Sequence, residues 1–97
     1  MAARLYNTPT HTTAALTTTS AAVLVANRQR KYALLVNDGT VDAYVFLGGT
    51  AVANQGVRVN ANGGSFEMSE LMGNLYKGVI NGILAAGTAT MLITEGV

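Results

Sequence analysis

Few side chains in this sequence can carry out catalysis, and their spacing does not bring them together. The chain has one histidine, His11, three serines and no cysteine. None of Ser20, Ser65 and Ser69 lies in a Gly-x-Ser-x-Gly pattern, which would hold a serine nucleophile on a sharp turn. Spacing also gives no reason to place His11 beside any of these serines as a general base. We therefore expect no catalytic residues and no enzyme activity.

The sequence also lacks the patterns that bind metals and cofactors. His11 has no acidic neighbour within its Thr-rich segment to complete a metal site. Asp38 and Asp42 lie in a turn that lacks the alternating oxygen ligands of a calcium loop. The pairs Gly48–Gly49 and Gly63–Gly64 precede no predicted helix and carry no P-loop lysine. We expect no metal, no cofactor and no small-molecule substrate.

The composition fits one small domain whose surface is covered by other subunits. The chain has 97 residues, enough for a single core, and no cysteine with which a disulfide could supplement that core. Hydrophobic residues make up 49% of the sequence and charged residues only 11%, against about 25% charged in an average globular protein. Because so few charges cannot coat a monomer in the usual way, we expect a homo-oligomer.

Charge and hydropathy argue against nucleic-acid and membrane partners. The net charge is +1, and the only basic cluster consists of Arg28, Arg30 and Lys31 beside a predicted strand. A cluster of this size predicts a solvated turn, since binders of the phosphate backbone carry a longer basic stripe. No apolar run approaches the roughly 18 to 20 residues that span a bilayer. Arg4 is followed by LYNTPTHTT, and a signal peptide would place an apolar stretch there.

The first twenty residues differ in composition and pattern from the rest of the chain. They are dense in Thr and Ala, contain the single proline, Pro9, and show no strand or helix period. Thr favours extended backbone, and proline is excluded from the interior of a helix. This pattern predicts an extended N-terminal arm over residues 1–20 that becomes ordered against a neighbour. A frayed terminus is the alternative.

From Ala21 onward the sequence predicts an antiparallel β-sandwich of seven or eight strands over residues 21–97. Short β-branched runs alternate with Gly, Asn and Asp about every ten residues, without helices of useful length between them. The segment SELMGNL predicts a loop with a short turn capped by Ser69. Turns are expected at Asn37–Gly39 and Asn62–Gly64. The predicted strands cover residues 22–26, 32–36, 43–47, 57–59, 65–68, 75–84 and 88–97.

Two of these predicted strands are apolar on both faces. Tyr44 and Phe46 lie on the face opposite to Ala43, Val45 and Leu47. If one face joins the core, the other forms an exposed apolar patch of the kind that soluble monomers avoid. The last strand has the same property, and the arm is expected to contact a neighbour. We therefore predict a protein interface at Leu5, Tyr6, Leu16, Tyr44, Phe46, Met91 and Ile93.

Between Arg30 and Val97, five pieces resemble a known family in their order along the chain. They are RKYALLVNDG, AYVFLG, GVRVNANGGSFEM, YKGVINGI and TATMLITEG, and the stretch that contains them covers about two thirds of the chain. A strand ending in Asn starts a hairpin, a Gly-rich turn precedes a strand, and the last strand closes with Glu-Gly. This stretch is similar to the head decoration, or cement, proteins of tailed bacteriophages, which are small β-sandwich proteins.

The resemblance implies a jelly-roll-like sandwich on the outer surface of the virion capsid, made in the cytoplasm of the bacterial host. Such a protein is a structural protein that forms a homodimer or homotrimer and ties neighbouring subunits of the major capsid protein together. Residues 1–29 have no match to the family, so the resemblance does not say how the arm docks.

Two other functions stay open at this point. One is a spike or tail module that binds a host glycan or another receptor, for which Tyr44, Asp42 and Asn37 supply an aromatic ring and polar neighbours. The other is a head-to-tail or tail connector subunit, which would form a ring around the portal axis.

Overall fold

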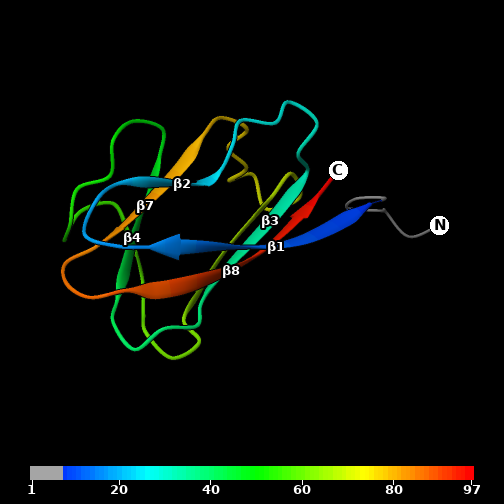
Figure 1. Cartoon of the computed structure of the whole chain (residues 1–97). Helices are drawn as coiled ribbons and strands as arrows, with labels where there is room; N and C mark the ends of the chain where they lie inside the picture. The colour runs from blue at the N-terminus through cyan, green and yellow to red at the C-terminus, as the bar shows by residue number, and fades with distance from the viewer. Residues whose placement is uncertain (1–7) are drawn as a thin grey trace.

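The computed structural model describes residues 8–97, and these residues form eight antiparallel strands in two sheets that pack face to face (Figure 1). None of the described residues forms a helix. The all-β, antiparallel class is as expected, and the two packed sheets are consistent with the predicted sandwich. The strands are β1 (Pro9–Leu16), β2 (Ala21–Leu24), β3 (Tyr32–Asn37), β4 (Ala43–Leu47), β5 (Val57–Val59), β6 (Ser65–Ser69), β7 (Ile80–Leu84) and β8 (Ala89–Gly96).

Each sheet contains four strands that come from distant parts of the chain. The β1 sheet has the order β1-β8-β3-β6, and the β2 sheet has the order β2-β7-β4-β5. Every connection except that between β4 and β5 therefore crosses from one sheet to the other. The β2–β3 and β6–β7 connections lie at one end of the sandwich, and the β7–β8 connection lies at the other end (Figure 1).

Residues 9–16, which we expected to lie in the arm, form β1. This strand pairs with β8 in an unbroken register from Pro9 opposite Gly96 to Leu16 opposite Ala89. Residues 1–7 lie outside the described residues, so the arm that orders against a neighbour stays a prediction.

The core lies between the sheets and is built from alternate residues of each strand. In β3, for example, Ala33 and Leu35 are buried, whereas Leu34 and Val36 are half-buried on the outer face. This two-residue period is the one that the sequence predicts. Gly82 of β7 is packed so closely that an added Cβ would lie 2.9 Å from the Val23 side chain and 3.1 Å from that of Leu16, so a side chain at this position would require its neighbours to move.

The strand predicted over residues 75–84 is shorter in the structure, where β7 begins at Ile80. The backbone carbonyls of Tyr76 and Gly78 accept hydrogen bonds from the Arg30 side chain at 2.7 and 3.1 Å. These residues are therefore held by a side chain and do not enter the ladder of the sheet. The Tyr76 ring lies against Gly78, where an added Cβ would be 2.5 Å from the Tyr76 hydroxyl oxygen.

The predicted turn at Asn37–Gly39 is present and depends on a buried side chain. Asn37 Nδ2 donates to the carbonyls of Val41 at 2.8 Å and Val59 at 3.0 Å, and its Oδ1 accepts from the N–H of Gly39 at 2.9 Å. The Asn37 side chain thus shapes the turn and also ties it to β5. Both the nitrogen and the oxygen of this buried amide therefore have hydrogen-bond partners.

Replacing this amide tests its role. We expect Asn37→Ala to lower the free energy of unfolding by about 2–3 kcal/mol, because two buried carbonyls and one N–H lose their partner. Urea unfolding followed by circular dichroism measures the change. The matched control is Asn60→Ala, since Asn60 is exposed and its side chain makes none of these contacts. Equal stability of the two variants would contradict this account of the turn.

Candidate interaction surfaces

The residues that could do chemistry are separated or serve the fold. Among residues 8–97, no group of three or more His, Cys, Asp and Glu side chains could hold a metal ion. His11 Nδ1 lies 2.9 Å from Thr94 Oγ1 on the outer face of the β1 sheet. The hydroxyl oxygens of Ser20 and Ser69 accept hydrogen bonds from the backbone N–H groups of Ala51 and Met72. The Ser69 bond caps the short turn that the sequence predicts.

No helix of the length and hydropathy that a membrane crossing needs is found within residues 8–97.

Arg30 is the residue that differs most from its prediction. Its side chain is fully buried, at 0% relative exposure, and all three of its guanidinium nitrogens have partners. Nε lies 2.7 Å from a carboxylate oxygen of Glu95 on β8, and Nη2 donates to the carbonyl of Val25 at 2.6 Å. Nη1 donates to the carbonyls of Tyr76 and Gly78. One side chain therefore connects β8, the β2–β3 connection and the β6–β7 connection.

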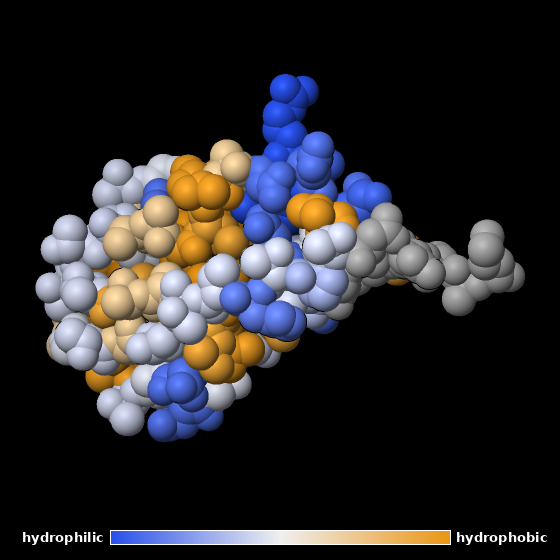
Figure 2. Space-filling model, turned by 45° about the vertical axis from the view of Figure 1, so that its right-hand side comes forward, coloured by the Kyte–Doolittle hydropathy of each residue, from blue (hydrophilic) through white to orange (hydrophobic). Residues whose placement is uncertain are grey.

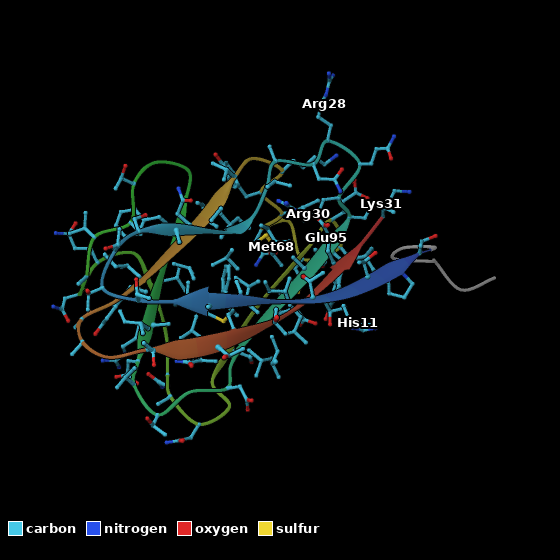
Figure 3. The ribbon with its side chains drawn as sticks, viewed as in Figure 1. His11, Arg28, Arg30, Lys31, Met68 and Glu95 are labelled. Carbon is cyan, nitrogen blue, oxygen red and sulfur yellow. The ribbon has the colours of Figure 1, made fainter. Side chains whose placement is uncertain are left out.

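The prediction of a solvated basic turn is wrong for Arg30, because a paired and fully hydrogen-bonded guanidinium can be buried. Arg28 is exposed and Lys31 is half-buried. Figure 3 shows the contrast: Arg28 projects away from the molecule, whereas Arg30 lies inside it beside Glu95. Within this cluster, a buried structural arginine thus lies between the exposed Arg28 and the half-buried Lys31.

The interface residues predicted from sequence fall into three groups. Leu5 and Tyr6 lie outside the described residues. Leu16, Met91 and Ile93 are buried in the core, because the register of β1 and β8 turns these side chains toward the other sheet. On β8 the large apolar side chain that reaches the surface is Leu92, which faces the other way. Tyr44 and Phe46 are half-buried on the outer face of the β2 sheet.

The surface around Tyr44 combines an aromatic ring with polar groups. Tyr44 lies between Arg58 on β5 and Ile83 on β7. An added Cβ at Gly56 would lie 2.7 Å from the Phe46 ring, so the chain itself covers part of that ring. The surface has an open depression of about 400 Å³ lined by Tyr44, Asn54, Gln55, Gly56 and Arg58.

Two members of the predicted glycan set are engaged in the fold. Asn37 is buried and its amide is fully hydrogen-bonded in the turn described above. Asp42 Oδ1 accepts from the N–H of Ala61 at 2.8 Å, a structural bond as well. Of the three residues proposed from sequence, Tyr44 is therefore the one that remains for a glycan site, beside the side chains of Asn54, Gln55 and Arg58.

The outer face of the β1 sheet is a second, more apolar surface. Val36 of β3 lies opposite Leu92 of β8, and Leu34 lies opposite Thr94. An open depression of about 570 Å³ on this face is lined by His11, Thr12, Thr13, Val36, Leu92, Ile93 and Thr94. In Figure 2 apolar side chains reach the surface of the sandwich in several separate patches between polar residues.

The three most exposed large apolar side chains lie on the two connections at the end of the sandwich where Arg30 is buried. Val25 is 72% exposed, Leu71 is 71% exposed and Met72 is 54% exposed. Val25 belongs to the β2–β3 connection, and the other two belong to the β6–β7 connection. We call these three residues the apolar end. The sequence analysis missed it, although the pair Leu71-Met72 in a predicted loop is a signal that could have found it.

Hydrogen bonds hold the two connections of the apolar end together. The N–H of Asn27 donates to the carbonyl of Lys77 at 2.8 Å, and the N–H of Glu70 donates to the carbonyl of Lys31 at 3.1 Å. A salt bridge of 3.9 Å between Lys77 and Glu70 lies on the surface, where such pairs contribute little. The exposed apolar side chains are thus carried on two connections that are fixed to each other and to β8.

Comparisons with family models, with curated proteins and with solved structures find no match for this chain.

The buried arginine can be tested directly. We expect Arg30→Ala to lower the free energy of unfolding by about 3 kcal/mol, because it leaves Glu95 and three carbonyls without their partner. The value is at the lower end for a buried pair, since the Glu95 side chain keeps 19% exposure to water. Urea unfolding measures it, with Arg28→Ala as the exposed control that should change stability by less than about 0.5 kcal/mol. Similar losses for both variants would show that Arg30 is not a structural residue.

Proposed function

We propose that this protein is a non-enzymatic structural protein of a bacteriophage virion. In this proposal it is a head decoration, or cement, protein that binds the outer capsid surface and bridges subunits of the major capsid protein. The single observation that carries the proposal is the apolar end, where Val25, Leu71 and Met72 are exposed on connections held in place by Arg30. A surface of this kind is typical of a site that another protein covers.

The fold we propose at finer detail is a jelly roll. Its support is the strand order, β1-β8-β3-β6 facing β2-β7-β4-β5, in which the chain crosses between the sheets at every connection but one. Eight strands in two packed sheets are the usual content of jelly rolls, which include many viral capsid domains. This likeness concerns the fold, and the functional proposal depends on the exposed surfaces.

A decoration protein gains stability on the particle from area buried against other chains. Burial of one Leu or Met side chain contributes about 1.5–3 kcal/mol, so the apolar end offers several kcal/mol to a complementary site. Because the two connections are already fixed, little conformational entropy opposes this contact. In the proposal, the predicted arm with Leu5 and Tyr6 and the half-buried rings of Tyr44 and Phe46 add further contacts, to the capsid or to other copies in a homodimer or homotrimer.

Binding to capsids tests the proposal. Purified protein is mixed with undecorated capsids of the same phage, and the bound fraction is measured by co-sedimentation. We expect saturable binding, and at least a ten-fold weaker affinity for the double variant Leu71→Ser/Met72→Ser, because two apolar contacts are lost. Since both side chains are exposed, the variant should remain folded.

The matched control is Ala85→Ser/Ala86→Ser, two exposed residues in the β7–β8 connection at the opposite end. It should bind like the unmodified protein. Absence of binding by folded, monodisperse protein would contradict the proposal. The number of copies per virion separates a decoration protein, expected in hundreds of copies, from a connector subunit, expected in about a dozen copies.

A glycan-binding module is the second candidate, and the depression beside Tyr44 favours it. An aromatic ring with amide and guanidinium groups nearby can stack on a sugar ring and bind its hydroxyls. Asn54, Gln55 and Arg58 line the depression together with Tyr44. A glycan array tests this candidate: a hit that Tyr44→Ala abolishes would support it, and an array without hits would remove it.

A further inference from the structure

β1 is an edge strand whose outer side has no partner among the described strands. The order β1-β8-β3-β6 places it at the end of its sheet. It is eight residues long, and its residues from Pro9 to Thr13 are all exposed. Figure 1 shows β1 running along the side of the sandwich next to β8.

The hydrogen bonds at the start of β1 show which backbone groups face outward. The N–H of Thr8 donates to the carbonyl of Val97, and the N–H of Val97 donates to the carbonyl of Thr8, both at 3.1 Å. In an antiparallel pair, every second residue makes such a double bond. The even-numbered residues of β1 therefore bond to β8. His11, Thr13 and Ala15 direct their N–H and C=O groups to the open edge.

The open edge of β1 lacks the features that usually prevent strands from pairing between molecules. Such features are charged side chains, bulges, proline and short length. β1 has no charged residue and an unbroken register, and Pro9 removes an N–H only at its first position. The edge is therefore able to accept another strand.

The other three edge strands each carry a protective feature. β2 has four residues and a register irregularity between Ala22 and Leu24. β5 has only three residues and presents Arg58, and β6 presents Glu67. Among the four edge strands, β1 is therefore the one without a feature that prevents pairing with another strand.

We infer that β1 is a self-association site, at which the β1 strands of two copies of this chain pair antiparallel and join their β1 sheets into one continuous sheet. The occupant is a second copy because the open groups match themselves. With the two-fold axis at Thr13, this residue lies opposite Thr13 of the second copy, and His11 lies opposite Ala15 of the second copy. All outward N–H and C=O groups of these three residues then have partners.

The side chains on both faces allow this register. On the outer face, His11 meets the small Ala15 and Thr13 meets another Thr, without like charges in contact. On the inner face, Thr12 lies beside Ala14 of the second copy. The pairing also makes the outer apolar surface around Val36 and Leu92 continuous across two copies. None of this depends on capsid binding, so the inference stands apart from the proposed function.

A covalent trap in the absence of capsids tests the inference. The chain has no cysteine, so Thr13→Cys introduces a single thiol. Directly opposite residues at hydrogen-bonded positions have Cα atoms about 5.5 Å apart, which a disulfide can span. We expect Thr13→Cys to form a disulfide-linked dimer under mild oxidation at least ten-fold faster than Thr18→Cys, an exposed control beyond the end of β1. Equal rates would overturn the inference.

Sedimentation equilibrium provides a second, non-covalent measurement. We expect the unmodified protein to show a monomer–dimer equilibrium below about 1 mM. Thr13→Lys places two like charges at the two-fold axis, so it should raise the dimer dissociation constant at least ten-fold, and the uncharged Thr13→Val should not. A protein that stays monomeric throughout, or equal dissociation constants for Thr13→Lys and the unmodified protein, would overturn the inference.

Discussion

The buried guanidinium of Arg30 is the interaction on which the organisation of this molecule depends. A charge without solvent is costly unless it is paired and all its donors are used. Here the carboxylate of Glu95 supplies the counter-charge, and the carbonyls of Val25, Tyr76 and Gly78 accept the remaining bonds. Because these partners come from three different parts of the chain, the arginine fixes the end of β8 and the two neighbouring connections at once. The chain has few charged residues, and one of them, Arg30, is buried where it orders the backbone.

This constraint explains how exposed apolar side chains can coexist with an ordered end. Val25 and Leu71 are exposed on two connections without strand structure. Arg30 holds both of them, since it donates hydrogen bonds to the carbonyls of Val25, Tyr76 and Gly78. The backbone bonds of Asn27 and Glu70 also join the two connections. The apolar end is thus preorganised, which lowers the entropic cost of binding a partner. Our functional proposal follows from this property, and the open edge of β1 gives the molecule a separate means of meeting its own copies.

Local patterns predicted much of the fold, because strands and turns are encoded by neighbouring residues. The alternation in β4 correctly put Tyr44 and Phe46 on the outer face, and the turn at Asn37 follows from side chains that tolerate turn geometry. The burial of Arg30 could not be predicted in this way, because its partner Glu95 is 65 residues away. The same limit applies to β8, which is apolar on both faces. Whether Leu92 or Ile93 is buried depends on the register of β8 with its neighbours.

The most direct test of the central claim is the amide hydrogen exchange of Asn27 and Glu70 in the free protein. Their N–H groups join the two connections that Arg30 organises, and they lie in segments without strand structure. If Arg30 fixes this end, both amides exchange as slowly as those of core strand residues such as Leu35. Exchange of both amides at the rate of an unprotected peptide, with the core strands still protected, would contradict the account.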